Sequence, residues 1–283
     1  MEILDKGIDI KDRELLKVLE YVSRQRGLDL LSAYRKEFVF RRLRLRMRTT
    51  RCSKALEYLE LLDKNDEEYN KFLDHLSINV TEFFRDEDVF EYFRKEVLPA
   101  IVKKKESSNE QIIRIWSAGC AHGQEPYSIS IILRESLDSK KKFFLRIWAT
   151  DIDSDALRVA NRAEYSAQDI KNIDKRIVEK YFNKAYNDIY VLGAEIKHDV
   201  FFKRHNLTEE PPLRYIDAVF CRNVMIYFHR QQQELLFKKF HQSLSASGYL
   251  IIGKTETIWD RDLFMPVNTQ LKIYRKNEVT EKE

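Results

Sequence analysis

The stretch "IWSAGCAHGQEPYSI", residues 115–129, contains two of the seven glycines in this 283-residue chain. Gly119 and Gly123 stand four residues apart, after a short apolar run and before Pro126. Glycine adopts backbone conformations that other residues avoid, and it lets the main chain approach a ligand closely. Pro126 falls in the first turn of an expected helix, where its missing N–H costs nothing. The stretch therefore predicts a strand, a glycine turn and a helix.

Strand-like and helix-like patterns alternate around this turn. Short apolar runs occur at 112–118, 143–150, 216–222 and 248–255, and helical spacing occurs at 125–137, 154–165 and 230–244. This alternation predicts an α/β fold with a Rossmann-like parallel sheet and helices on both faces. The interval at about 181–205 breaks the rhythm and predicts a small antiparallel β subdomain inserted into the catalytic domain.

Residues 1–78 show only helical spacing and predict an all-α N-terminal domain, followed by a second domain at 79–283. One helix, expected within 32–50, places four apolar residues on one face: Val39, Phe40, Leu43 and Met47. Its other face gathers arginines, with two more at the flanks: Arg41, Arg44 and Arg48, then Arg42 and Arg46.

The composition indicates a soluble globular protein, with 43% hydrophobic and 34% charged residues. No apolar run is long enough to span a membrane, and the acidic start is unlike a signal peptide, so we expect a cytoplasmic protein. Three widely spaced cysteines form neither a metal-binding pair nor a disulfide framework. We expect no metal site.

The glycine turn lacks the third glycine of a dinucleotide fingerprint and the Gly-Lys-Ser/Thr of a phosphate loop. An adenosyl cofactor without phosphates, S-adenosylmethionine, suits such a turn. Asp151, which follows the second strand, could accept hydrogen bonds from both ribose hydroxyls. Asp153 or Asp155 could instead simply cap the next helix. These features alone leave a methyltransferase and other nucleotide-binding α/β proteins open.

Four stretches together resemble the chemotaxis receptor methyltransferases, the CheR family: "NVTEFFRD" (79–86), "WSAGCAHGQEPYSI" (116–129), "ATDID" (149–153) and "FCRNVMIYF" (220–228). The resemblance covers nearly the whole chain. Relatives often have Ser-Thr-Gly-Glu where this chain has Ala-His-Gly-Gln at 121–124.

The resemblance implies methyl transfer from S-adenosylmethionine to receptor glutamates, giving γ-glutamyl methyl esters and S-adenosylhomocysteine. It also implies a set of residues that line the cofactor, and the glycine turn adds Gly119 to this set. They are Asn79, Thr81, Arg85, Glu125, Asp151, Asn206, Leu207, Arg222 and Asn223. Arg85 and Tyr227 would lie nearest the transferred methyl group and act as the catalytic residues.

The implied chemistry needs no general base, because a glutamate is already an anion at neutral pH. The Arg85 guanidinium and the Tyr227 hydroxyl could orient that carboxylate. Without the family resemblance, Tyr227 is more simply explained as a core aromatic residue.

The basic helix suggests docking on acidic receptor helices through Arg42, Arg44, Arg46 and Arg48. A merely solvated charged face is the plain alternative. A methyltransferase acting on RNA is a further alternative that only the basic helix suggests, although no aromatics are interleaved for base stacking. A non-catalytic cofactor-binding relative is the other alternative.

We further expect a monomer that binds no nucleic acid and does not insert into the membrane. Some members of the family bind a receptor C-terminal pentapeptide through a glycine-containing loop of the β subdomain. This chain has "NKAYND" at 183–188 instead. Glycine favours the positive φ values that such a loop would use, so we expect docking without the pentapeptide tether.

Overall fold

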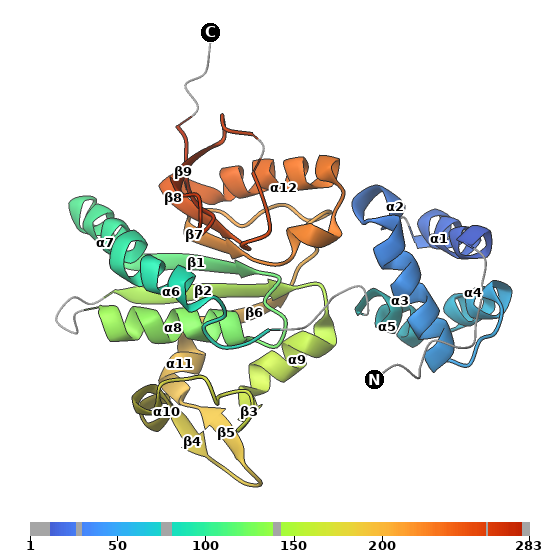
Figure 1. Cartoon of the computed structure of the whole chain (residues 1–283), viewed down its shortest axis with the longest axis horizontal. Helices are drawn as coiled ribbons and strands as arrows, with labels where there is room; N and C mark the ends of the chain where they lie inside the picture. Colours follow the sequence, from blue (N-terminus) through green and yellow to red (C-terminus); the bar gives the residue numbers. More distant parts are fainter. Residues whose placement is uncertain (1–11, 27–29, 75–80, 138–142, 259, 279–283) are drawn as a thin grey trace. The chain divides into compact units, whose positions relative to one another are not determined.

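The computed structural model describes residues 12–26, 30–74, 81–137, 143–258 and 260–278. Contacts divide the chain into two compact units, which we describe separately (Figure 1). Unit 1 comprises residues 1–78 with 227–233, and unit 2 comprises residues 79–226 with 234–283.

Unit 1 is built on five helices in its described residues: α1 (Asp12–Arg26), α2 (Leu30–Ala33), α3 (Lys36–Thr49), α4 (Ala55–Lys64) and α5 (Asp66–Asp74). Helix α3 buries the four residues of its predicted apolar face, with Val39 and Leu43 at zero exposure. Helix α4 begins where the Glu57 carboxylate accepts hydrogen bonds from the backbone N–H groups of Ser53 and Lys54. The unit therefore has its own apolar core.

Unit 2 contains a seven-stranded sheet in the order β6-β2-β1-β7-β8-β10-β9. Its strands are β1 (Ile112–Ala118), β2 (Phe144–Asp151), β6 (Val200–Arg204), β7 (Ile216–Cys221), β8 (Leu244–Ile252), β9 (Phe264–Asn268) and β10 (Ile273–Lys276). The first five pair in parallel, whereas β10 pairs antiparallel with β8 and β9. The predicted parallel sheet is confirmed, although β9 and β10 lay outside every predicted strand.

Helices cover both faces of this sheet. They are α6 (Glu87–Tyr92), α7 (Leu98–Ser107), α8 (Gln124–Ser136), α9 (Ser154–Arg162) and α12 (Arg230–Ser243). Figure 1 shows the sheet between α12 on one side and the group of α6, α7 and α8 on the other. Trp116 of β1 faces α12, where its ring meets Phe240, whereas Ile115 belongs to the core on the α8 side.

The helix that begins with α6 does not end at Pro99, although a proline inside a helix often ends it. The chain passes through a five-residue π-helical turn, η1 (Phe93–Val97), and continues as α7, which carries Pro99 in its first turn. A proline has no N–H for the carbonyl one turn earlier and crowds it. The wider π turn accommodates that loss, so the helix continues.

A separate three-stranded antiparallel sheet has the order β3-β5-β4. Its strands are β3 (Glu164–Ser166), β4 (Phe182–Lys184) and β5 (Ile189–Leu192), accompanied by α10 (Lys175–Tyr181) and α11 (Ala194–Asp199). The predicted bounds of about 181–205 need correction at both ends. β3 joins from earlier in the chain, and β6 leaves to pair with β2 in the central sheet.

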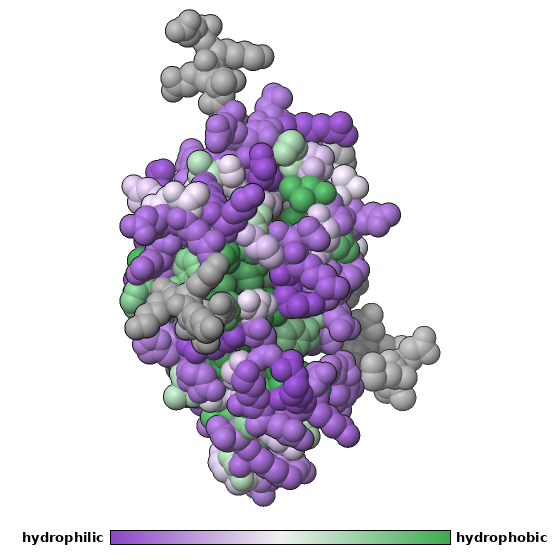
Figure 2. Space-filling view, turned by 90° about the vertical axis from the view of Figure 1, so that its left-hand side faces the viewer, coloured by the Kyte–Doolittle hydropathy of each residue, from purple (hydrophilic) through white to green (hydrophobic). Residues whose placement is uncertain are grey.

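Within the described residues, no helix is long and apolar enough to cross a membrane. On the face drawn in Figure 2, hydrophilic side chains predominate around smaller hydrophobic patches.

Candidate active site

The glycine turn after β1 is shaped by two close approaches. Gly119 has a φ of 83°, and a Cβ there would collide with Cγ2 of Val224. Gly123 has a φ of 89° and stands at the N-terminus of α8, where a Cβ would lie 3.0 Å from that of Ala160. The amides of Gly119 and Cys120 both donate to the Thr150 carbonyl, at 2.8 and 3.0 Å. The turn is therefore fixed to the end of β2.

Asp151, the last residue of β2, points its carboxylate at this turn. Oδ2 accepts from the amide of Ala121 at 2.8 Å, and Oδ1 accepts from the amide of Asp153 at 3.0 Å. Burial raises the pKa of Asp151, and the two amides oppose that shift. A carboxylate oxygen can accept more than one hydrogen bond, so both oxygens of Asp151 can still accept from the ribose hydroxyls.

The helix-capping alternative belongs to a different aspartate. The Asp153 carboxylate accepts hydrogen bonds from the amides of Asp155 and Ala156, at 2.8 and 2.9 Å, and so caps α9. The prediction that one of the later aspartates caps this helix is confirmed. Asp151 is thus left for the turn and its ligand.

Arg222, directly after β7, links three parts of the site. Its Nη2 donates to the Asp86 carboxylate and, at 2.8 Å, to the Arg85 carbonyl. Its Nη1 lies 3.4 Å from Oε2 of Glu125, whose other oxygen accepts from the Ser117 hydroxyl at 2.7 Å. Only 2% of the Arg222 side chain is exposed. Burial raises the pKa of Glu125, and Arg222 opposes the shift.

The segment before α6 carries two further predicted cofactor residues, Thr81 and Arg85, both partly exposed. The Phe84 amide donates to the Ser128 hydroxyl of α8 at 2.9 Å, which fixes this segment beside the glycine turn's helix. Asn79 lies outside the described residues.

Asn206 and Leu207 follow β6 in a loop that is held from several sides. The side-chain oxygen of Asn206 accepts from the Thr208 amide and hydroxyl, at 3.0 and 2.8 Å. Lys239 of α12 donates to the Leu207 carbonyl at 3.0 Å. The His205 amide donates to the Asp151 carbonyl at 2.9 Å, which joins this loop to the end of β2.

Asn223 has a left-handed backbone, with a φ of 59°. Its buried Oδ1 has no hydrogen-bond partner among the residues that the structure describes. Buried acceptors in proteins are normally paired, and an unpaired one needs an explanation. The amino group of a bound cofactor would be such a partner. Together with the glycine turn and Asp151, this acceptor suits S-adenosylmethionine.

These residues follow four neighbouring parallel strands, β6, β2, β1 and β7, whose carboxyl ends share one edge of the sheet. The strand order reverses at β1, which is where ligands bind in open α/β sheets. Sequence reasoning missed Asp86, Ser117 and Ser128, which hold the predicted residues in place. Asp86 lies in "NVTEFFRD" and both serines lie in "WSAGCAHGQEPYSI", so these two stretches were the signal that could have found them.

Tyr227, the other predicted catalytic residue, is grouped with unit 1. Its ring stacks on Phe38 with centroids 4.7 Å apart, and its carbonyl accepts from the Arg35 amide at 3.0 Å. The ring thus packs on an aromatic residue of α3, as the simple core explanation expects. Its catalytic role stays a prediction.

The predicted docking arginines of α3 differ in their surroundings. Arg48 is exposed, Arg44 pairs with Asp12 at 2.7 Å, and Arg42 lies over the Phe38 ring at 5.7 Å. Arg46 is only 6% exposed, and its guanidinium pairs with the buried Glu68 carboxylate. Arg46 is therefore a core residue of unit 1, and its assignment to a docking surface is corrected.

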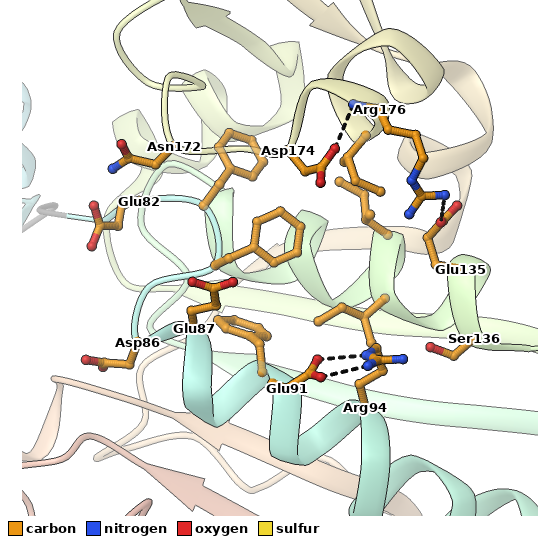
Figure 3. A pocket seen from close by; sticks show the side chains of 16 residues that line it. Glu82, Asp86, Glu87, Glu91, Arg94, Glu135, Ser136, Asn172, Asp174 and Arg176 are labelled. Atoms are coloured by element: carbon orange, nitrogen blue, oxygen red, sulfur yellow. Dashed lines mark hydrogen bonds and ion pairs between the residues drawn. The ribbon is translucent and has the colours of Figure 1, made fainter.

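A groove of about 840 Å³ lies elsewhere on unit 2, between α6, α8 and α10 (Figure 3). Its walls are acidic, but three of the acids are ion-paired, Asp86 with Arg222 as described above. Glu91 accepts from Arg94 at 2.8 and 2.7 Å, and Glu135 pairs with Arg176 at 2.8 Å. None of the cofactor candidates lines this groove, although Asp86 from the segment before α6 does.

The sheet, its glycine turn and the acceptors at its carboxyl edge define the class of Rossmann-like methyltransferases. The chain belongs to the CheR methyltransferase family. The family's SAM-binding domain matches residues 79–273, and its all-alpha domain matches residues 13–77. S-adenosylmethionine is therefore its cofactor, and the predicted fold class is confirmed.

Curated relatives extend over most of the chain. It is 34% identical to a chemotaxis protein methyltransferase of Borreliella burgdorferi, over 89% of this chain and 90% of the relative. It is 31% identical to chemotaxis protein methyltransferase 2 of Vibrio cholerae, over 89% and 88%. A chemotaxis protein methyltransferase of Salmonella typhimurium is 28% identical, over 89% and 86%.

Proposed function

We propose that this protein methylates glutamate side chains of chemotaxis receptors in the cytoplasm, forming γ-glutamyl methyl esters for sensory adaptation. The observation that carries the proposal is the site itself: buried acceptors at the carboxyl edge of the sheet that suit the cofactor, in a chain whose relatives are named chemotaxis methyltransferases.

S-adenosylmethionine supplies a methyl group on a positively charged sulfur. A receptor carboxylate oxygen would take this methyl group, and the electron pair of the broken carbon–sulfur bond would stay on sulfur. No proton moves, so the residues need only align the three atoms and exclude water. The reactants are oppositely charged and the products neutral, which a partly desolvated site favours.

The chain's own residues divide this work. Asp151 would accept hydrogen bonds from the ribose hydroxyls, and Asn223 Oδ1 would accept one from the cofactor's amino group. Arg222 and Glu125 hold the segment of Thr81 and Arg85 against the turn through the contacts described above. The Arg85 guanidinium orients the receptor carboxylate without binding it so tightly that its nucleophilicity falls, and the Tyr227 hydroxyl is the second candidate for this role.

The receptor docks through the basic surface of α3, which we define as Arg41, Arg42, Arg44 and Arg48. Exposed arginines attract the acidic helices of receptor methylation regions and orient them on approach. We further propose that docking needs no pentapeptide tether and that the enzyme acts as a monomer.

Tritiated methyl transfer to receptor-containing membranes tests the function. Counts that mild base releases as methanol are expected, because an ester hydrolyses under these conditions. Base-stable counts, or transfer to RNA only, would contradict the proposal. Binding of S-adenosylhomocysteine without any transfer would indicate a non-catalytic relative.

A further inference from the structure

Glu256 is a buried carboxylate in the turn that follows β8, outside every residue assigned so far. It is 4% exposed. Its Oε2 accepts from the Gly253 amide at 2.6 Å, and its Oε1 accepts from the Met225 amide at 2.8 Å. The Glu256 amide in turn donates to the Gly253 carbonyl at 2.9 Å. One side chain thus joins its own turn to a segment 31 residues earlier.

That earlier segment, residues 222–226, carries the β7 side of the cofactor site. Gly253 packs so closely on it that a Cβ there would lie 2.8 Å from the Asn223 nitrogen and 3.1 Å from its Nδ2. Val224 occupies the space that a side chain at Gly119 would need. A small shift of this segment would therefore displace three features together. They are the unpaired Asn223 Oδ1, the ion pairs of Arg222 and the Val224 side chain that packs on the glycine turn.

Backbone amides donate hydrogen bonds to this carboxylate. Among the described residues, no cation lies within salt-bridge distance of it. Burial raises the pKa of Glu256, while hydrogen bonding from the backbone of Gly253, Met225, Asn223 and Ile226 opposes the shift. Desolvating a carboxylate costs free energy that these amides offset. Since amides are fixed in the main chain, the carboxylate sets the main-chain path of residues 223–226 and not merely a side-chain contact.

We propose that Glu256 is a positioning residue for methyl transfer, whose carboxylate holds residues 222–226 so that Asn223 and Arg222 meet the cofactor. The role rests on the cofactor site and on no particular methyl acceptor. S-adenosylhomocysteine binding therefore tests it separately from receptor methylation.

The test compares Glu256→Gln with Asp217→Asn. The glutamine side chain keeps the size of glutamate but has an NH2 donor in place of one carboxylate oxygen. This donor would face a backbone N–H, with which it cannot form a hydrogen bond. Asp217 is the control: it is 5% exposed and accepts from the Arg114 amide at 2.9 Å at the opposite, amino end of β7, while its other oxygen pairs with Lys105 at 2.8 Å. Both variants lose one buried carboxylate acceptor for a backbone amide.

By calorimetric titration, Glu256→Gln should bind S-adenosylhomocysteine roughly 10-fold or more weakly, in keeping with the loss of a charged hydrogen bond. Asp217→Asn should lower the melting temperature and leave this affinity unchanged. An unchanged affinity in a folded Glu256→Gln protein would overturn the proposal, as would an equal loss of affinity in both variants.

If Glu256→Gln does not fold, Gly253→Ala tests the same contact without removing the carboxylate. The added methyl group pushes against Asn223 and should also weaken binding of S-adenosylhomocysteine. Gly248→Ala is its control in β8, where a Cβ would lie 3.0 Å from Leu244 Cδ2, away from residues 222–226. Equal affinities for the two alanine variants and wild type would overturn the proposal.

Discussion

Asp151 and Asp153 are two buried aspartates, two residues apart, with different structural tasks. The Asp153 carboxylate caps the N-terminus of α9, whereas the Asp151 carboxylate faces the glycine turn. We expect Asp151→Ala to weaken S-adenosylhomocysteine binding by on the order of 1.5–3 kcal/mol, or roughly 10- to 150-fold. Calorimetric titration measures it.

Asp153→Ala is the control for this substitution. It should cost about 1 kcal/mol of stability through the lost helix cap, with little change in affinity. The reverse pattern, a stability loss at Asp151 and an affinity loss at Asp153, would exchange the two roles.

Glu135, near the end of α8, joins the central sheet's helix to α10. Its carboxylate accepts from Lys180 at 2.6 Å and from the Tyr181 hydroxyl at 2.8 Å, and it pairs with Arg176. Hydrogen bonding from Lys180, then from Tyr181 and Arg176, lowers its pKa from 4.5 to about 2. Because the folded pKa lies below the unfolded one, its stabilisation is present above pH 4.5 and is lost as the pH falls toward 2.

The melting temperature of Glu135→Gln should therefore lie well below that of wild type at pH 7, and the gap should narrow below pH 4.5. Glu179→Gln on the exposed part of α10 is the control, with a small gap at every pH. A Glu135→Gln gap that stays constant from pH 7 to 3.5 would show that the ionised carboxylate is not what stabilises.

At the scale of an element, α3 separates into a docking face and a buried edge. Arg41 and Arg48 are exposed, so reversing both charges should not disturb the core of unit 1. We expect Arg41→Glu with Arg48→Glu to raise the KM for receptor and to weaken the effect of salt on that KM. The affinity for S-adenosylhomocysteine should be unchanged.

Two comparisons interpret that result. Arg24→Glu with Lys64→Glu makes the same charge change at other exposed positions of unit 1 and should leave the KM unaltered. Arg46→Glu should instead unfold unit 1, because it places a second carboxylate beside the buried Glu68. Normal receptor methylation by the Arg41/Arg48 variant would mean that this face is merely solvated.

The hairpin between β4 and β5 requires a correction to the tether argument. Asn187 and Asp188 both have positive φ, 46° and 57°, although neither is glycine. Asn and Asp tolerate this region better than other residues. The absence of glycine therefore does not prevent such a turn, and the proposal now rests on the hairpin's short closed loop. Backbone hydrogen bonds close it from Ala185 to Ile189 and from Ile189 to Tyr186.

We still predict no saturable binding to an immobilised receptor C-terminal pentapeptide. The loop's main chain is engaged with itself and offers a peptide little to pair with. A fluorescence titration with the free peptide gives the same information in solution. Micromolar binding that disappears when residues 183–188 are replaced would contradict the prediction.

For the whole molecule, the cofactor candidates in the described residues belong to unit 2, whereas Tyr227 and the docking arginines of α3 belong to unit 1. A ligand stabilises the part that binds it, by about 2.7 kcal/mol at 100 times its dissociation constant. S-adenosylhomocysteine should therefore raise the unfolding temperature of unit 2 by roughly 5–10 °C and leave a separate unit 1 transition in place.

Differential scanning calorimetry resolves the two transitions, and Arg46→Ala identifies that of unit 1 because it leaves Glu68 buried without its partner. A single transition that the ligand shifts as a whole would show that the two units unfold together.

Much of the fold and of the site followed from short patterns. The glycine turn, the parallel strands and the apolar face of α3 are local features, because side-chain spacing reports directly on a helix or strand. The place of Asp151 followed too, since the carboxyl ends of parallel strands share one edge of a sheet.

Contacts between distant parts of the chain needed the tertiary structure. Arg222 meets Glu125 and Asp86, 97 and 136 residues away, and Glu256 meets Met225. Arg46 flanks the apolar face of α3, and its burial depends on α5, whose Glu68 carboxylate pairs with it. The spacing of residues fixes which way a side chain points from its own element, but its burial and partners depend on what packs against it.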